Sequence, residues 1–408
     1  MAFRRTIART LLGGTFCAAC ASTATPPPVP PVTPTDRCIV GSGGADTVVI
    51  ALGEAARADH APKPANDSER LAFRQEYDTV VRIDCDGRLR PGLAESWTTD
   101  SGGSVWTFRL ADRVFSGGGP ITAERVLESW NRYNASLQPS LAGVSAAEAR
   151  VLIVTPGSSA GVAALADPGL AVAGPPRPHG RPEASTPMRP VIEYRIASGS
   201  RLLDLLPHGV DIAVTRDPAA IAYATRLSEF AVSPLPADRT YFLVTTSGPV
   251  VDAGRDTVEQ RRFRSELARD VVSEAASAAE PLPGGGMPCR SEAPPRVGPR
   301  RRILYPRGDR TARELAERIV ALASVELTLE AAESDEMAAT VLSGADYAYI
   351  LPFPRVRPIS CAGQLVLPRD AVITALVDTR AHLLLRRGAA RVEVEQDGIP
   401  RILPPNSP

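Results

Sequence analysis

Hydrophobic residues along the chain form two kinds of pattern, and together they predict a mixed α/β protein. Short apolar runs and apolar–polar alternation indicate strands. Asp-Gly pairs after such runs, at Asp86-Gly87 and Asp397-Gly398, favour tight hairpin turns. The segments that we expect to be strands are Thr47–Leu52, Tyr77–Ile83, Val105–Leu110, Val210–Val214, Tyr241–Thr245, Arg302–Tyr305, Val325–Leu329, Tyr347–Leu351 and the two arms of Val392–Leu403.

Apolar residues spaced three or four positions apart indicate helices. After Thr122, which can cap a helix, Val126, Leu127, Trp130 and Tyr133 form one stripe. Further helices are predicted after the Asp217-Pro218 cap, over Thr257–Val272, after a capping box of Thr311 and Glu314, and over Ser334–Leu342.

Residues 302–351 carry the most regular alternation of predicted elements. Three strands are separated by two helices there, and this βαβαβ order predicts a largely parallel sheet. The proline-rich stretches Gly174–Pro190 and Ala279–Arg300 are typical of loops. We expect the chain to pass between lobes at these two places.

The first residues are typical of an export signal. Leu11–Ala21 is apolar but too short to span a bilayer, and it follows a positively charged start at Arg4 and Arg5. Cys20 fits a bacterial lipobox, in which the cysteine is lipidated. Cleavage after Ala21 without lipidation is the alternative, and the arginine pair leaves twin-arginine export open.

A proline-rich stretch follows the signal. Thr23–Thr35 combines prolines with small residues, so it predicts an extended, semi-rigid tether. Ordered structure is expected to begin at Thr47–Leu52.

The balance of charge argues against a nucleic-acid partner. The 408 residues include 46 basic and 46 acidic side chains, for a net charge of +0, and no basic stripe stands out. The four histidines are scattered, and no Cys-x-x-Cys pair lies beyond the signal. We therefore expect neither a metal site nor a cofactor.

Catalytic motifs are also missing from the sequence pattern. Gly41–Gly44 precedes the first strand, so it does not form the nucleophile elbow of a hydrolase. His60, His179, His208 and His382 have no carboxylate at a useful spacing. No catalytic residue is predicted.

Four cysteines lie beyond the signal: Cys38, Cys85, Cys289 and Cys361. Four cysteines allow three pairings, and sequence alone does not choose among them. An oxidising compartment permits disulfides. Because Cys289 and Cys361 flank residues 302–351, we predict a disulfide between these two.

A series of short motifs carries a resemblance to a known family. The motifs are Tyr77–Val81, Asp86-Gly87, Pro91–Trp97, Trp106–Leu110, Val114-Phe115 and Gly119–Glu124. In this order they resemble the family 5 solute-binding proteins, which deliver peptides, nickel and similar solutes to ABC transporters. Pro352–Arg355 stands where the family has a segment whose aspartate holds a peptide's amino group, so the resemblance does not name the solute.

The resemblance implies a fold and a domain division. The fold is an α/β, periplasmic-binding-protein-like fold of class II (cluster C type), with two main lobes and an extra N-terminal subdomain. The expected division is signal 1–21, tether 22–46, lobe I from 47–78, 185–255 and 375–408, the subdomain of lobe I 79–184, and lobe II 256–374.

The resemblance also implies a function without catalysis. A monomer in the periplasm or cell envelope, lipid-anchored at Cys20, would bind a peptide or small solute between its lobes and present it to an ABC transporter permease. The expected solute contacts are Thr245, Thr246 and Ser247 on one side and Tyr347, Tyr349 and Phe353 on the other. The alternative is a surface lipoprotein that keeps the fold as an interaction module without a transported ligand.

Overall fold

The protein is described by a computed structural model that covers residues 36–404 except 116–117, 134–140, 157–160, 175–189, 198–200, 246–265, 267–275, 279–289, 292–301, 308, 323–326, 334–335, 338–339, 342–346, 356–366 and 369–370. Within these residues no helix has the length and apolar character needed to cross a membrane. The predicted signal, the tether up to Thr35, the loop at 175–189 and most of the predicted helix Thr257–Val272 lie outside the described residues.

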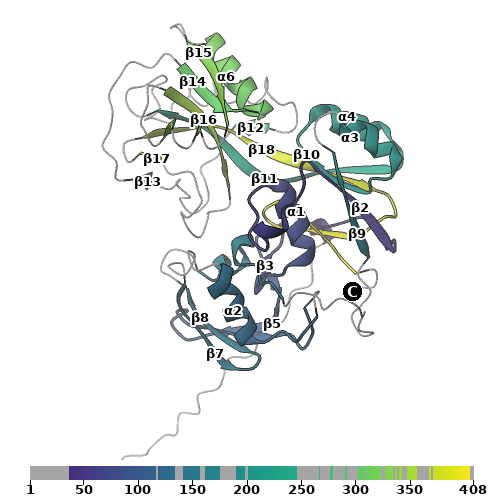
Figure 1. The fold of residues 1–408 in the computed structure, drawn as a ribbon, viewed down its shortest axis with the longest axis vertical. Helices are drawn as coiled ribbons and strands as arrows, with labels where there is room; N and C mark the ends of the chain where they lie inside the picture. The colour runs from purple at the N-terminus through teal and green to yellow at the C-terminus, as the bar shows by residue number, and fades with distance from the viewer. Residues whose placement is uncertain are drawn as a thin grey trace, which may run out of the picture.

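A nine-stranded mixed sheet connects most of the chain (Figure 1). Its strands lie in the order β15-β14-β16-β11-β18-β10-β2-β9, and β12 pairs with β18 beside this path. The strands are β2 (Thr47–Leu52), β9 (Val191–Ile196), β10 (Ile212–Thr215), β11 (Phe230–Thr245), β12 (Ala276–Ala278), β14 (Arg302–Pro306), β15 (Thr328–Ala332), β16 (Tyr347–Pro354) and β18 (Val372–Arg386).

Strands β11 and β18 run through both halves of this sheet. They pair antiparallel from Phe230 opposite Arg386 to Thr245 opposite Val372. Strand β10 pairs with β18 at residues 382–385, whereas β16 pairs with β11 at residues 239–244. The ladder between β11 and β18 is irregular between residues 234 and 239, where the pairing changes from one half to the other.

Three helices accompany the first half of the sheet. They are α1 (Asp67–Glu76), α3 (Arg201–Leu205) and α4 (Pro218–Arg226). Strand β2 lies between β10 and β9 in parallel and is buried along its length after Thr47, as a central parallel strand should be. Helix α4 begins as predicted, because the Asp217 side chain accepts a hydrogen bond from the Ala219 N–H at 3.0 Å.

Helix α1 has no counterpart among the predicted elements. It is capped by Asn66, whose side-chain oxygen accepts from the Glu69 N–H at 2.8 Å. Leu71, Ala72 and Phe73 pack into the core shared with β2 and β18.

The second half of the sheet contains the three strands and the first helix of the predicted βαβαβ unit, and much of the predicted helix Ser334–Leu342 lies outside the described residues. Strand β14 pairs in parallel with both β15 and β16, which confirms the predicted parallel arrangement. Helix α6 (Arg310–Leu322) follows β14, and its Leu315 and Ile319 pack on Ile303 and Ile350.

The predicted start of helix α6 at Thr311 was wrong. Asp309 caps the helix instead, because its Oδ1 accepts from the Ala312 N–H at 2.9 Å. Glu314, expected to complete a capping box, pairs with Arg310 one turn earlier.

A separate four-stranded sheet and a helix make a third unit. The strands lie in the order β5-β6-β8-β7, and α2 packs its own apolar stripe into their core. Trp130 of α2 is buried, and its Nε1 donates to the Leu170 carbonyl at 2.9 Å. Trp97 and Trp106 are partly buried and pack against the same core. These elements are β5 (Ala94–Thr99), β6 (Trp106–Leu110), α2 (Ala123–Tyr133), β7 (Leu141–Glu148) and β8 (Val151–Pro156).

Short elements complete the fold. The predicted hairpins are β3 (Val81–Ile83) with β4 (Leu89–Pro91), and β19 (Val392–Val394) with β20 (Pro400–Ile402). A small parallel pair joins β13 (Arg290–Ser291) to β17 (Leu367–Pro368). Single 3-10 turns lie at Asp36–Cys38, Ala58–His60, Val162–Ala166, Pro168–Leu170 and Leu206–His208.

Ordered structure begins earlier than the sequence suggested. Strand β1 (Ile39–Val40) pairs with β19, so the chain is part of the fold before Thr47. Gly41 follows with a φ of +81°, and a Cβ there would meet the Ala390 carbonyl oxygen at 2.5 Å. Gly41–Gly44 is therefore packed against the body of the protein and is not a free linker.

Candidate functional site

Polar side chains occupy the parts of β11 and β18 that cross between the halves of the sheet. We call residues 236–240 and 378–382 the waist. Leu235 and Leu383 belong to the apolar core of the first half, and Tyr241 belongs to that of the second. The buried polar side chains between them are Asp238, Thr240, Asp378, Thr379 and His382. The waist therefore separates two apolar cores with a polar band.

One group of contacts holds the two waist strands to β16. Thr240 donates its hydroxyl to Asp378 Oδ1 at 2.5 Å, and Arg355 forms an ion pair with the same carboxylate. The Arg355 N–H also donates to the Asp238 carbonyl at 2.8 Å. Since Asp378 is almost fully buried, these partners are needed to compensate for the loss of water.

A second group of contacts joins the waist to α1. Asp67, in the first turn of α1, accepts from Arg216 at 3.2 Å and from Arg239, and Arg70 lies 3.9 Å away. Arg216 also donates to Asp238, which lies 4.0 Å from the Arg239 Nε. Two carboxylates and two guanidiniums thus alternate in one cluster, which we call the Asp67 cluster: Asp67, Arg216, Asp238 and Arg239.

The two carboxylates of the Asp67 cluster differ in environment. The Asp67 side chain is 46% exposed and the Asp238 side chain 9% exposed. Partial burial acts to raise the pKa of Asp67, but Arg239 and Arg216 outweigh it and lower the pKa to about 2. Burial raises the pKa of Asp238, and the same two arginines compensate only in part. Asp67 is therefore firmly ionised and is the carboxylate of the pair in contact with solvent.

The N-terminal end of α6 connects the two halves beside the waist. Tyr241 donates its hydroxyl to Asp309 at 3.0 Å, and burial together with this carboxylate raises the pKa of the Tyr241 hydroxyl. The next residue, Arg310, lies 3.7 Å from Asp217, the cap of α4. This contact pairs a helix start from one half with a helix start from the other.

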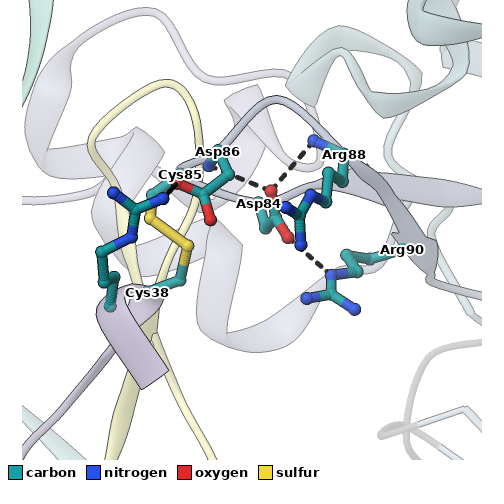
Figure 2. The surroundings of a disulfide bond; sticks show 7 residues. Cys38, Asp84, Cys85, Asp86, Arg88 and Arg90 are labelled. Atoms are coloured by element: carbon teal, nitrogen blue, oxygen red, sulfur yellow. Dashed lines mark hydrogen bonds and ion pairs between the residues drawn. A yellow bond between two sulfur atoms is a disulfide. The ribbon is translucent and has the colours of Figure 1, made fainter. Parts of the chain in front are cut away.

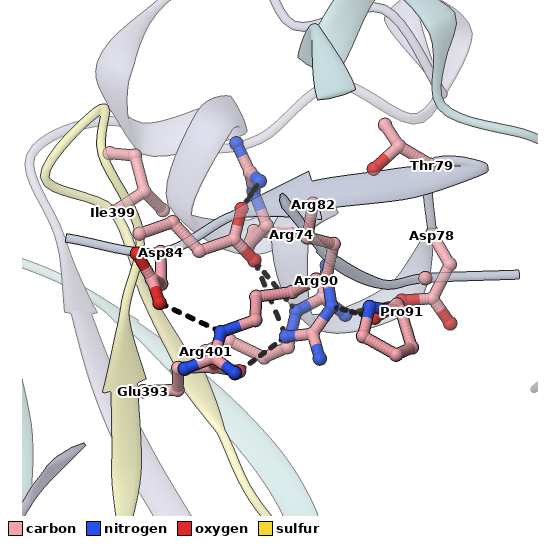
Figure 3. Close-up of polar contacts among 12 residues, drawn as sticks. Arg74, Asp78, Thr79, Arg82, Asp84, Arg90, Pro91, Glu393, Ile399 and Arg401 are labelled. Carbon is pink, nitrogen blue, oxygen red and sulfur yellow. Dashed lines mark hydrogen bonds and ion pairs between the residues drawn. The ribbon is translucent and has the colours of Figure 1, made fainter. Parts of the chain in front are cut away.

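A buried ion network joins α1, the β3–β4 hairpin and the β19–β20 hairpin (Figure 3). Arg401 donates to Asp78 at 2.6 Å and to Glu395 at 3.1 Å, and Arg74 pairs with Glu395 as well. The other pairs are Arg74–Asp397, Arg82–Glu393 and Arg90–Asp84. Burial acts to raise the pKa of Asp397, but Arg74 and Arg70 outweigh it and lower that pKa. These side chains form ion pairs with one another, so we assign them the role of holding α1 and the two hairpins together.

A disulfide lies beside this network (Figure 2). Cys38, just before β1, is bonded to Cys85 in the turn of the β3–β4 hairpin. Asp86 is nearby, but the two sulfurs are bonded to each other and supply no thiolate for a metal. Of the three pairings, this bond is compatible only with Cys289–Cys361. Those two cysteines lie outside the described residues, so their disulfide stays a prediction.

One histidine has a carboxylate partner that the sequence did not indicate. His60 Nδ1 lies 2.8 Å from Glu69, a fully buried residue. The Glu69 side chain also accepts from the backbone N–H groups of Arg57 and Ala65. All of these contacts hold the turn before α1, so the pair has a structural role.

The predicted solute contacts are placed only in part. Thr246 and Ser247 lie outside the described residues, and so does the side chain of Tyr347. Thr245 is buried opposite Val372 at the end of β11. The assignment of all six residues to solute binding stays a prediction.

Two of these residues lie in the apolar core of the second half. Tyr349 is fully buried and donates its hydroxyl to the Thr340 carbonyl at 3.1 Å. Phe353 packs edge-on against Phe242, with ring centroids 5.6 Å apart. Tyr349 therefore has a core role, and Phe353 is partly buried against the same core. The waist and the Asp67 cluster were not predicted, since their residues are far apart in sequence.

Comparisons of sequence match one segment of the chain. Residues 88–168 match the family model described as bacterial extracellular solute-binding proteins, family 5 Middle. The nickel-binding periplasmic protein of Escherichia coli is 44% identical over 64 residues, which are 15% of this chain and 12% of that protein. The periplasmic oligopeptide-binding protein OppA of Escherichia coli is 39% identical over 70 residues, 17% of this chain and 12% of that protein. The sequence match therefore spans a small part of these relatives.

Comparisons of structure extend over most of the chain. DppA from Helicobacter pylori, in complex with the peptide STSA, matches with a TM-score of 0.60 at 12% identity, over 89% of this chain and 97% of that one. NikA from Staphylococcus aureus, in complex with Ni(L-His)2, matches with a TM-score of 0.60 at 11% identity, over 88% and 99%. These matches confirm the predicted fold class. The family matched by residues 88–168 consists of binding proteins, which agrees with the expectation that the chain is not an enzyme.

Proposed function

Because residues 88–168 match the family 5 extracellular solute-binding proteins and the fold matches DppA over most of the chain, we propose that this protein is the extracytoplasmic solute-binding component of an ABC importer. It binds a peptide or similar small solute between two lobes and carries out no reaction on it. Proteins that match this chain in sequence or in fold are named for oligopeptides, a murein tripeptide and nickel.

The two lobes of this proposal correspond to the two halves of the sheet. Cores drawn from residues 48–73, 197–235 and 381–399 form lobe I, and cores drawn from residues 241–377 form lobe II. The unit at residues 80–172 has a core of its own and is the additional subdomain. Core membership supports a lobe boundary within the waist, near Asp238, rather than at residue 255.

The polar waist between the two lobes is the strongest support for the proposed function. A clamp needs a place where its lobes turn relative to one another while each keeps its core. Two strands cross between the lobes, their ladder is irregular at Pro234–Arg239, and the side chains there are polar. Bending at the waist exchanges hydrogen bonds and ion pairs, whereas bending elsewhere would open an apolar core. Solute binding would then shift an open–closed equilibrium that the transporter senses.

Export and lipid anchoring at Cys20 are part of the proposal. The Cys38–Cys85 disulfide supports export, because disulfides persist in oxidising compartments and are rare in the cytosol. Membrane fractionation of the wild type and of Cys20→Ala tests the anchor. We expect the wild type in the membrane fraction and the variant in the soluble fraction; equal solubility of both would contradict lipidation and leave cleavage after Ala21.

Native mass spectrometry of the mature protein tests whether it binds a solute. We expect a small molecule to be retained from the cell, and small-angle scattering should then show a smaller radius of gyration with that solute than without it. An unchanged radius, with undiminished affinity in a Thr246→Ala, Ser247→Ala, Tyr349→Ala variant, would contradict both the clamp and the predicted contacts.

A second candidate function is a surface interaction module without a transported ligand. The full burial of Tyr349 in the core of lobe II favours it, because this side chain is then not available to a solute. This reading predicts that no small molecule is retained and that scattering is unaffected by any added solute.

A further inference from the structure

Asp67 occupies the kind of site in which proteins bind a carboxylate from outside. Its side chain lies between two guanidiniums that come from separate elements, Arg216 after β10 and Arg239 in β11. Arginine is the residue best suited to this task, because its planar fork of N–H donors matches a carboxylate. The carboxylate held here belongs to the protein itself.

The position of Asp67 makes it replaceable. Asp67 is the most exposed member of the Asp67 cluster, and Arg216 and Arg239 are 22% and 23% exposed, so solvent reaches all three side chains. Helix α1 does not depend on Asp67 for its cap, since Asn66 has that role. A displaced Asp67 would also stay near the positive end of the helix, where a negative charge is favourable.

The hydrogen bonding of the cluster is incomplete. Asp238 Oδ1 and Arg216 Nε are buried atoms, and neither has a hydrogen-bond partner. Asp238 as a whole is more than nine-tenths buried. Buried polar atoms without a partner are uncommon in proteins, and they raise the free energy of the arrangement that contains them. Asp238 Oδ1 is thus an acceptor without a donor, and Arg216 Nε is a donor without an acceptor. Both atoms lie where Arg216 donates to two carboxylates, those of Asp67 and Asp238.

We propose that Asp67 is an internal stand-in for a carboxylate of the solute, which competes with it for Arg216 and Arg239. The inference rests on the proposed function and narrows it to solutes that carry a free carboxylate, such as peptides with a free C-terminus or small organic acids. The exchange places the solute on the lobe I side of the waist and frees β11 from its contact with α1. Occupancy of the site is thereby coupled to the strand that has to bend.

Removal of the competitor is the sharpest test. Asp67→Asn keeps the shape of the side chain and removes its charge, so we expect carboxylate solutes to bind more tightly than to the wild type, by roughly tenfold. Arg239→Gln removes one guanidinium and should weaken binding by a similar factor. Asp59→Asn is the matched control, because Asp59 forms an exposed ion pair with Arg57 away from the waist.

The probes are one pool of tripeptides as free acids, the same pool as C-terminal amides, and a panel of small mono- and dicarboxylic acids, all titrated by calorimetry. We expect free acids to bind and amides not to bind. If Arg239→Gln does not fold, as judged by circular dichroism, Asp67→Asn and Arg239→Lys keep the test decisive.

The possible outcomes separate the two proposals. Equal binding of acids and amides, or unchanged affinity in Asp67→Asn, would overturn the stand-in and leave the solute-binding function intact. If no probe binds but native mass spectrometry finds a retained solute without a carboxylate, the stand-in is again wrong and the function stands. If no probe binds and no solute is retained, both proposals fail.

Discussion

Cys38 and Cys85 are joined by a disulfide, with Cα atoms 5.4 Å apart, and this bond ties the residue before β1 to the turn between β3 and β4. The bond spans 47 residues of sequence. In the chain-entropy account, a loop of this length contributes about 4 kcal/mol to the free energy of unfolding. We expect Cys38→Ser with Cys85→Ser to lower that free energy by about this amount in urea titrations.

Reduction of the wild type gives a matched control. Dithiothreitol should lower the stability of the wild type and leave the double variant unchanged. Equal stability of the wild type and the variant without reductant would mean that the bond does not form in the protein.

Asp67 should make stability depend on pH in acid. Its pKa of about 2 in the folded protein lies below the ordinary value of 3.8, so its contribution is fully present above about pH 4 and is lost as the pH falls toward 2. Between pH 5 and pH 2.5 we expect the wild type to lose more of its unfolding free energy than Asp67→Asn does. Because Asp67 is nearly half exposed, water and salt screen the effect, and added sodium chloride should reduce it. Parallel pH curves for the two proteins would contradict this assignment.

Trp130 should depend on its indole nitrogen. Trp130→Phe removes the donor to the buried Leu170 carbonyl and leaves a space, so we expect a loss of about 2 kcal/mol in unfolding free energy. Trp106→Phe is the control, because the bond from its Nε1 to the Gly103 carbonyl lies at the surface. That variant should lose at most about 1 kcal/mol. Similar losses of unfolding free energy in the two variants would mean that the buried hydrogen bond of Trp130 contributes no more to stability than the surface hydrogen bond of Trp106.

Asp309 and Thr311 give opposite expectations for the start of α6. Asp309→Ala removes the helix cap and the acceptor of the Tyr241 hydroxyl, so it should lower the unfolding free energy by about 2 kcal/mol. Thr311→Ala, which the sequence pattern alone would single out, should change it by less than about 0.5 kcal/mol. Thermal or urea unfolding of both variants decides between the two caps, and a larger loss in Thr311→Ala would restore the cap inferred from sequence.

Elements with a strong local pattern were predicted well. The stripe after Thr122 became α2, the Asp217-Pro218 cap started α4, and both Asp-Gly turns became hairpins. In each of these places a few neighbouring residues determine the local conformation. Sequence alone is then sufficient.

Helix α1 was missed because its buried side is partly charged. Glu69, Arg74 and Gln75 are buried beside Leu71 and Phe73, so the hydrophobic pattern gives no clear stripe. A signal did exist, since Asn66 followed by Glu69 is the spacing of a capped helix start.

The long strand β11 was predicted only at its end. Pro234, Pro236, Asp238 and Arg239 are residues that ordinarily argue against a strand, and here they lie in or next to the waist. The part of β11 that passes through the waist therefore has the sequence pattern of a loop, although it is a strand.

The Asp67 cluster has no local signature at all. Asp67 and Arg239 are 172 positions apart in the sequence. The buried ion network is similar in this respect, because its Arg74 and Glu395 are 321 positions apart. A surface charge and a member of a cluster look alike until the fold brings them together. The six predicted contact residues came from family resemblance, and that resemblance carries no information about these ion pairs.

The pairing of early strands with late ones sets an order on folding. Strand β1 needs β19, and β10, which joins β2 to the rest of the sheet, needs β18. Lobe I consequently stays incomplete while some 300 further residues are synthesised, whereas the subdomain at residues 80–172 has all its strands within one short stretch. Such separations slow folding and leave unpaired strands exposed. A chain that holds a finished subdomain beside an open half-sheet exposes unpaired strand edges, which favour aggregation, until the last strands arrive. Arg401, in β20, is among the last residues to join the fold.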